Sequence, residues 1–261
     1  MFAKERYTKI MNLLAEKGTV STTQLMQLFE VSIETVRRDL LELEKKGALQ
    51  RVHGGAVAIG EMKDCTDLSH RIEEHKSAKQ ELGETAAMLV KDNDVIYIDA
   101  GSTAIYFAES LKNRLSKLTV VTHSLDVFQI LAAKEGFQVI LCGGYFIKEE
   151  KAFYGQLAMD ALSKLHVGKA FLFPVAISLR GGVCDYSYEL SQMQQRIMAS
   201  ADRLYFLADS DKFEKHALLK ICDMSVNHVY VTDSKLKESY KQLYKEKEYQ
   251  VITSKAEGEG L

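Results

Sequence analysis

The chain lacks the features of a membrane, secreted or metal-binding protein. No apolar run among its 261 residues approaches the roughly 20 residues needed to cross a bilayer, and the N-terminus has no apolar signal-peptide region. Its four cysteines are scattered, without the paired spacing of a disulfide framework or a zinc site: Cys65, Cys142, Cys184 and Cys222. We therefore expect a cytoplasmic protein with reduced thiols, no membrane contact, no metal site and no cofactor.

A strong excess of either charge sign is also missing. The formal net charge is −2, which argues against a globally basic nucleic-acid binder. Residues 1–60 nevertheless carry nine Lys/Arg and seven Asp/Glu, or +2, which leaves −4 for the remainder. A weakly basic head on an acidic body fits DNA contact confined to one small module. Because such a head makes few phosphate contacts, useful affinity requires several heads in one assembly.

The most informative segment runs from residue 31 to residue 46 and has the pattern of a DNA-recognition helix. Val36, Leu40 and Leu43 share one helix face, and Ser32 is a suitable N-cap. A helix that presents guanidinium groups and a hydroxyl suits the major groove, because Arg pairs with guanine edges or phosphates. The alternative is an ordinary amphipathic helix with a solvated charged face. The candidate DNA contacts on this helix are Ser32, Glu34, Thr35, Arg37 and Arg38.

The neighbouring segments favour DNA recognition. A first helix is marked by Tyr7, Ile10 and Leu14, and a second by residues 24–29, so three helices precede residue 48. Residues 48–57 alternate polar and apolar side chains up to a glycine pair, which predicts a hairpin wing. We assign its Arg51 and His53 to phosphate or minor-groove contact. A hydrogen-bonded histidine of the hairpin is the alternative for His53.

Residues 31–57 resemble the winged helix-turn-helix of DeoR-type bacterial repressors. The resemblance implies that the third helix enters the major groove and that the wing touches the flanking backbone. The matching positions are Ser32, Thr35, Arg37, Arg38, Asp39, Leu40, Gly47, Leu49, Arg51, His53, Gly54, Gly55 and Ala56.

The rest of the chain has the pattern of an α/β domain. We expect a winged helix-turn-helix at residues 1–58, a polar linker at 59–69 and an α/β sensor domain at 70–261. Near-continuous apolar runs separated by helical stretches predict a mostly parallel sheet covered on both faces. The expected strands are residues 95–99, 118–122, 138–142, 170–173, 204–208, 229–232 and 249–253.

Small polar residues follow four of these strands, at the edge where parallel sheets bind ligands. The donors of Gly101, Ser102 and Thr103 at a helix N-terminus suit an anion, and Lys212 adds a positive charge. These residues predict a pocket for a polyol phosphate, with Asp99 or Asp209 accepting from hydroxyls. Any single turn of this kind could be simple helix capping. The other two turns contain Thr122, His123 and Ser124, and Gly143 and Gly144.

The resemblance to DeoR-type repressors extends over nearly the whole chain. It implies a sensor domain similar in fold to ribose-5-phosphate isomerase and CoA-transferases, which responds to phosphorylated sugars. It adds Arg71, Lys79, Asp185 and Glu189 to the matching positions, and we include Lys79, Asp185 and Glu189 among the expected effector contacts. The departures are His123 in place of the usual Asn, Pro174 in place of Gly, and Gln194 and Gln195 in place of a Lys-Arg pair. The missing lysine predicts a changed ligand or weakened sensing.

Three hypotheses about function follow from these patterns. The first is a repressor of a sugar-catabolism operon that binds double-stranded operator DNA as a dimer or tetramer and responds to a phosphorylated sugar. The second is a sugar-phosphate isomerase with an appended DNA module, whose base would be Asp185, Glu189 or Lys212. The third is a winged helix that binds protein. We favour the first hypothesis and expect no catalytic residues.

Overall fold

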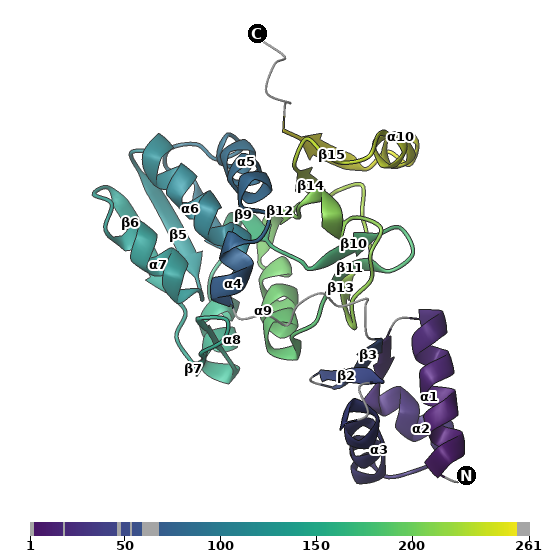
Figure 1. The fold of residues 1–261 in the computed structure, drawn as a ribbon. Helices are drawn as coiled ribbons and strands as arrows, with labels where there is room; N and C mark the ends of the chain where they lie inside the picture. The colour runs from purple at the N-terminus through teal and green to yellow at the C-terminus, as the bar shows by residue number, and fades with distance from the viewer. Residues whose placement is uncertain (1–2, 18, 46–47, 53, 59–67, 255–261) are drawn as a thin grey trace.

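The computed structural model describes residues 3–17, 19–45, 48–52, 54–58 and 68–254, which form an N-terminal helical module and a larger α/β domain (Figure 1). The predicted DNA contact His53 lies outside the described residues, as does most of the expected linker. Residues 68 and 69, which we expected in that linker, lie in a helix instead.

The N-terminal module has the predicted order of three helices followed by a wing. Ser21 caps α2, since its side chain accepts a hydrogen bond from Gln24 N at 3.1 Å, and Ser32 accepts from Thr35 N at 3.4 Å at the start of α3. The wing contains a third strand that we did not predict, and its order is β1-β3-β2. The elements are α1 (Ala3–Lys17), β1 (Thr19–Ser21), α2 (Thr22–Phe29), α3 (Ile33–Lys45), β2 (Leu49–Val52) and β3 (Gly55–Ala58).

An ion pair beneath α3 supports its orientation. The predicted apolar stripe of Val36, Leu40 and Leu43 is buried, together with residues of α1 and α2. Asp39 is buried as well, and both of its oxygens accept from the Arg6 guanidinium of α1, at 2.5 and 2.9 Å. This bidentate pair joins the first helix to the recognition helix and fixes which face of α3 remains exposed.

The larger domain is built on a seven-stranded sheet in the order β15-β14-β12-β9-β4-β5-β6, in which every described pairing is parallel. All seven expected strands are present, and the predicted α/β fold is confirmed. The strands are β4 (Val95–Ile98), β5 (Leu118–Thr122), β6 (Phe137–Leu141), β9 (Val167–Leu172), β12 (Ala201–Leu207), β14 (Val229–Thr232) and β15 (Gln250–Thr253).

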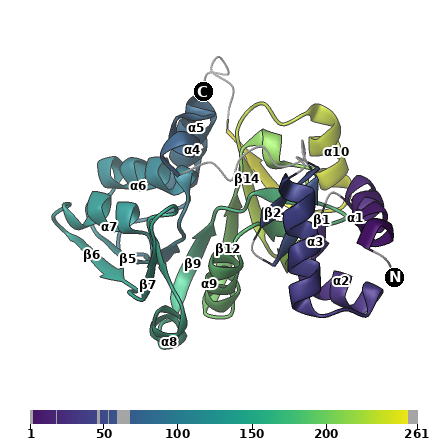
Figure 2. The same ribbon diagram turned by 60° about the horizontal axis from the view of Figure 1, so that its bottom comes forward.

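Helices cover both faces of this sheet, which explains the uninterrupted apolar runs of its strands. Helices α5, α6 and α7 pack on one face and α8, α9 and α10 on the other, where α8 and α9 lie side by side (Figure 2). The helices are α4 (Leu68–Glu73), α5 (Lys76–Ala87), α6 (Ser102–Arg114), α7 (Leu125–Ala132), α8 (Gln156–Ser163), α9 (Tyr188–Met198), α10 (Glu238–Glu246) and the short 3-10 helix η1 (Ser210–Lys212).

Two small antiparallel sheets were not predicted. One is a hairpin, and the other is a three-stranded sheet in the order β10-β11-β13. Their strands are only three or four residues long, too short for a pattern of alternating hydrophobicity to stand out. They are β7 (Tyr145–Ile147), β8 (Ala152–Tyr154), β10 (Ala176–Ser178), β11 (Gly182–Asp185) and β13 (Leu219–Cys222).

Candidate DNA interface and ligand cavity

The exposed face of α3 and the strand β2 form one shallow hollow. Its lining brings together five of the seven predicted DNA contacts with one leucine: Glu34, Thr35, Arg37, Arg38, Arg51 and Leu41. Ser32 is exposed and caps the helix rather than lining the hollow. Its hydroxyl also lies 3.1 Å from that of Thr35. The guanidinium-rich surface expected for the major groove is therefore continuous from helix to wing.

The three arginines of this surface differ in how firmly they are held. Arg37 pairs with Glu34 at 3.1 Å, whereas Arg38 makes no hydrogen bond or ion pair with another described residue. Arg51 is held twice by Glu44 of α3, through its backbone N at 2.8 Å and its Nε at 2.7 Å. Burial disfavours the charged Glu44 carboxylate, but the hydrogen bonds from Arg51 outweigh it and lower the pKa of Glu44.

A cavity of about 400 Å³ lies in the α/β domain, and four of the predicted effector-binding residues line it: Lys79, Ser102, Asp209 and Lys212. Ten further residues complete the lining: Arg71, Glu74, His75, Val175, Ala176, Tyr186, Asp211, Lys215, His216 and Ala217. The wall thus carries one arginine, three lysines and two histidines against three carboxylates. A concave, polar site of this size with a small excess of positive charge suits a small anionic ligand.

Lys79 is the most perturbed cation of the cavity. Its residue surface is only 3% exposed, and its ammonium donates to the backbone oxygens of Arg71 and, at 2.6 Å, Glu74. Burial, followed by repulsion from Lys212, lowers the pKa of Lys79 to about 8. The charge of a negative ligand would offset both effects, so this side chain is well placed to favour an anion.

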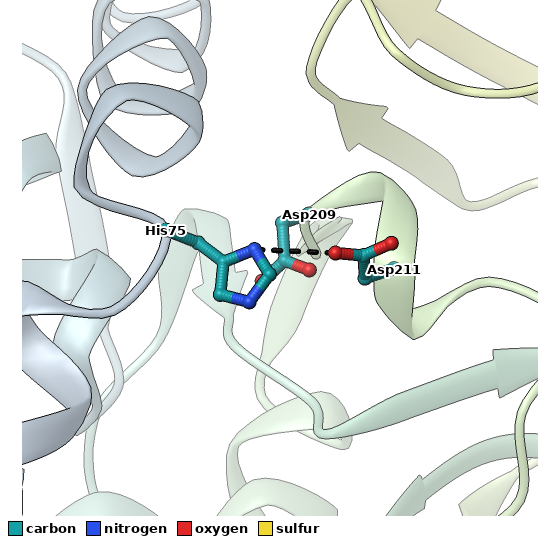
Figure 3. A group of neighbouring side chains, drawn as sticks. All are labelled: His75, Asp209 and Asp211. Atoms are coloured by element: carbon teal, nitrogen blue, oxygen red, sulfur yellow. Dashed lines mark ion pairs between the residues drawn. The ribbon is translucent and has the colours of Figure 1, made fainter.

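His75, Asp209 and Asp211 face one another at this cavity (Figure 3). One ligand atom from each lies within 4.8 Å of the others, a spacing that could hold a metal ion. Their partners indicate ion pairs instead, since His75 Nδ1 lies 3.2 Å from Asp211 Oδ2 and Lys212 Nζ lies 3.5 Å from Asp209 Oδ2. The lysines around Asp209 also oppose a cation. We therefore assign these groups to the wall of an anion site.

Three other predicted effector residues form a buried hydrogen-bond network away from the cavity wall. Asp99, His123 and Asp185 are each at most 3% exposed, and Gln194 joins them. The Gln194 amide nitrogen donates to Asp99 Oδ2 at 2.8 Å and to Asp185 Oδ2 at 3.0 Å. The other Asp185 oxygen accepts from the backbone N–H groups of Tyr186 and Ser187. Burial raises the pKa of Asp185 to about 6.

The contacts of His123 require a shared proton in this network. Its Nδ1 lies 2.7 Å from the carbonyl oxygen of Phe153, which can only accept, so Nδ1 carries a hydrogen. Its Nε2 lies 2.8 Å from Asp99 Oδ1, and one proton must lie in that contact too, on the ring or on the carboxyl group. Asp99 is thus satisfied by His123, Gln194 and the Tyr97 hydroxyl, without a ligand.

The remaining predicted effector residues are not among those that line the cavity. Thr122 and Ser124 serve the turn into α7, in which the Ser124 hydroxyl accepts from Val127 N and Thr122 Oγ1 accepts from Ser124 N. Gly101 adopts φ +146° as the N-cap of α6, a conformation that favours glycine. The others are Thr103, which is buried, Gly143 and Gly144 after β6, and Glu189, which accepts from Ser187 Oγ at 3.3 Å.

The sequence analysis missed cavity residues on four segments: Glu74 and His75 precede α5, Val175 and Ala176 lie at the start of β10, Tyr186 follows β11, and Asp211, Lys215, His216 and Ala217 lie in or after η1. A signal for the last segment was present, since Lys215 and His216 continue the polar run that contains Asp209 and Lys212. Arg71 matches the family pattern, but we did not predict it as an effector contact.

Comparison with known proteins agrees with this architecture. Residues 6–61 match the family model of the DeoR-like helix-turn-helix domain, and residues 74–234 match that of the DeoR C-terminal sensor domain. Together with the winged helix and the α/β domain, these matches define a DNA-binding transcriptional regulator. The chain belongs to the DeoR family.

Several relatives align over almost their entire length. The chain is 30% identical to the HTH-type transcriptional regulator IolR of Bacillus subtilis, covering 91% of this chain and 94% of that one. It is 32% identical to the L-fucose operon activator of Haemophilus influenzae (88% and 92%) and to a lactose phosphotransferase system repressor of Staphylococcus aureus (88% and 91%). Ribose 5-phosphate isomerase A of Neisseria gonorrhoeae shows a partial likeness of fold, with TM-score 0.40, 17% identity and 52% and 53% coverage.

The described residues include no helix long and apolar enough to span a membrane.

Proposed function

We propose that this regulator is a repressor of a sugar-catabolism operon in the cytoplasm, and that a phosphorylated sugar in the 400 Å³ cavity changes its affinity for operator DNA. The observation that carries the proposal is the cationic wall around Lys79 and Lys212 in a chain that also has a winged helix. The names of relatives that control fucose and lactose genes support the sugar pathway. The mechanism requires only that the ligand bind the DNA-competent and DNA-incompetent arrangements unequally.

The four predicted residues of the cavity wall bind different parts of the ligand in this proposal. Lys212 and Lys79 supply positive charge to the phosphate, and Ser102 supplies a donor at the start of α6. Asp209 can accept from sugar hydroxyls. Asp99 cannot share that task in the arrangement described, because its oxygens are buried and already accept from His123 and Gln194. We therefore narrow the effector site to residues of the cavity wall.

The test is thermal melting of the full chain against a panel of phosphorylated sugars and their unphosphorylated parents. A ligand at 100 times its dissociation constant adds about 2.7 kcal/mol to the free energy of unfolding, which is a shift of a few degrees. We expect a shift with a phosphosugar and its loss in Lys212→Ala. Lys164→Ala, an exposed lysine outside the cavity, should retain the shift. No shift with any phosphorylated compound would refute the proposed effector class.

We propose that the chain has no isomerase activity. Two of the candidate bases, Asp185 and Glu189, are not among the residues that line the cavity, and Asp185 is occupied by two backbone N–H groups and Gln194. A general base must lie within hydrogen-bond reach of the proton that it removes. The relatives named above are also regulators. Turnover of a pentose or hexose phosphate by the purified chain would contradict this.

A further inference from the structure

The short helix α4 lies between the two segments that the family models match. The helix-turn-helix match ends at residue 61 and the sensor match begins at residue 74, whereas α4 spans Leu68–Glu73. This helix nevertheless packs on the sensor domain. Leu68 is 1% exposed, and the Tyr106 hydroxyl of α6 donates to the backbone oxygen of Ile72 at 2.9 Å. Helix α4 is therefore docked onto the domain that holds the cavity.

A latch holds α4 to the hairpin of β7 and β8. The Arg71 guanidinium of α4 lies 2.5 Å from Glu150 Oε2, and the Tyr186 hydroxyl donates to the other Glu150 oxygen at 3.0 Å. The guanidinium carbon also lies 5.8 Å from the centre of the Tyr186 ring. Glu150 is 8% exposed. One backbone bond, from Leu68 N to the carbonyl oxygen of Glu149 at 3.3 Å, completes the attachment.

The same segment forms part of the cavity wall. Arg71, Glu74 and His75 all line the cavity, and so does Tyr186 from the other side of the latch. Lys79, also in the wall, donates to the backbone oxygens of Arg71 and Glu74 at the end of α4. The Arg71 guanidinium and the Lys79 ammonium, which would attract an anion, are thus also the groups whose hydrogen bonds hold α4 in place.

We propose that α4 reports occupancy of the cavity to the connection with the winged helix, and that Glu150 is the positioning residue of this latch. A phosphate dianion in the cavity offers Arg71 a bidentate partner that carries more charge than one carboxylate. It also offers the Lys79 ammonium a charged acceptor in place of two carbonyl oxygens. Binding of the ligand exchanges these partners, and α4 loses its attachment to Glu150. The inference rests on the proposed function, since it requires an anionic ligand in this cavity.

Amide hydrogen exchange of the full chain tests the latch without a ligand. Glu150→Gln removes the charge that holds Arg71, and we expect exchange of residues 69–75 to rise about ten- to hundredfold, because hydrogen bonds to charged groups contribute that much to a local opening constant. Glu149→Gln is the matched control, because the adjacent exposed side chain undergoes the same chemical change and only its backbone oxygen contacts α4. Tyr186→Phe keeps the ring and deletes one hydrogen bond, so a smaller rise is expected.

The ligand arm repeats the exchange measurement with a phosphosugar that shifts the melting temperature, or with inorganic phosphate if that shifts it. If the proposal holds, the anion raises amide exchange of residues 69–75 in the natural chain. In Glu150→Gln, where exchange is already raised, the anion adds little. An anion whose melting shift depends on Lys212 but which leaves or lowers exchange of α4 overturns the latch and spares the proposed function. If no anion binds either the natural chain or the Glu150→Gln variant, both the proposed function and the latch are overturned. Equal exchange in Glu150→Gln and Glu149→Gln also overturns the latch.

Discussion

Gln194 holds two buried carboxylates by giving them both hydrogens of one amide group. Its nitrogen lies 2.8 Å from Asp99 Oδ2 and 3.0 Å from Asp185 Oδ2, and its Oε1 has no hydrogen-bond partner among the described residues. A neutral donor at this position is tolerated because His123 shares a proton with Asp99 on the opposite side. Both buried carboxylates therefore have donors without the lysine that the family resemblance places at this position.

Gln194→Glu should lower the free energy of unfolding by about 3 kcal/mol or more at pH 8, because it places a third carboxyl group among buried acids. The loss should be smaller at pH 5. A buried carboxyl has a raised pKa in the folded state, as Asp185 already does at about 6, so its protonated form is favoured and destabilisation grows as pH rises through that range. Urea unfolding at the two pH values measures the effect. Gln195→Glu is the control, because Gln195 is exposed and its amide nitrogen donates only long hydrogen bonds, at 3.4 and 3.3 Å, to the backbone oxygens of Lys220 and Ile221. Equal losses in both variants would contradict the argument.

Lys79 should make anion binding depend on pH. Its pKa in the folded protein is about 8, below the usual 10.5, because of burial and Lys212. The charged form, which favours an anion, is present below pH 8 and is lost as pH rises above it. If only that form binds, the affinity falls up to tenfold for each unit above pH 8. Titration calorimetry with the phosphosugar identified by melting, between pH 7 and 9.5, measures this. Lys79→Arg keeps its charge throughout and should flatten the profile; an unchanged slope would exclude Lys79 as the source.

The role of single residues was only partly predictable from the sequence. The turns that contain Asp99 and Lys212 could be recognised because small polar residues follow apolar strands. Whether such a side chain faces the cavity or the interior depends on partners far away in the chain. The hydrogen-bond partners of Asp99 are His123 and Gln194, which lie 24 and 95 positions later in the chain, and no local pattern indicates such pairs. Lys212 remains at the cavity because its partner Asp209 belongs to the same short turn.

At the scale of elements, the wing is fastened to the recognition helix through one carboxylate. Glu44 of α3 accepts from both the backbone and the side chain of Arg51 in β2. The same contact links β2 to α3 and gives the Arg51 guanidinium a carboxylate partner that competes with any DNA phosphate. Removing the Glu44 charge would both loosen β2 and free the Arg51 guanidinium. These two consequences can be separated by how DNA binding depends on salt.

Glu44→Gln should tighten binding to duplex DNA of arbitrary sequence at low salt and steepen its salt dependence. A freed Arg51 adds about one phosphate contact, so the slope of log K against log salt should change by about −0.9. Fluorescence anisotropy with a labelled duplex measures both quantities. Glu42→Gln is the control, because it removes an equal charge from the same helix. Glu42 pairs with Lys45 at an exposed position, so this variant should change the slope little. Weaker binding by Glu44→Gln would mean that positioning of the wing outweighs the freed charge.

Element types were predictable where a pattern extends over enough residues. The inner strands of the parallel sheet are largely buried on both faces, so their apolar runs are continuous and distinct from the helices between them. The sheet β10-β11-β13 and the hairpin of β7 and β8 escaped prediction because each strand has only three or four residues. These small sheets border the proposed effector cavity, because the hairpin carries Glu150 and the segments around β10 and β11 supply Ala176 and Tyr186 to its wall.

For the whole molecule, the main prediction concerns assembly. The hollow of α3 and β2 presents few side chains to DNA, and a single recognition helix reads only a few base pairs. Since residues 1–60 carry a net charge of only +2, one head also gains little from phosphates. Both limits are overcome when two or more heads bind one operator, because the second contact is then intramolecular. We therefore expect a dimer or tetramer in solution.

Selection of binding sites from random duplexes should recover paired half-sites whose centres lie about 10 base pairs, or a multiple of this, apart. Sedimentation equilibrium of the full chain, at the protein concentration used for selection, should give at least twice the mass of one chain. Inserting about 5 base pairs between half-sites turns one to the opposite side of the duplex and should weaken binding at least tenfold, whereas inserting 10 should restore most of the affinity. A monomer that binds a single half-site as tightly as the pair would show that one winged helix suffices.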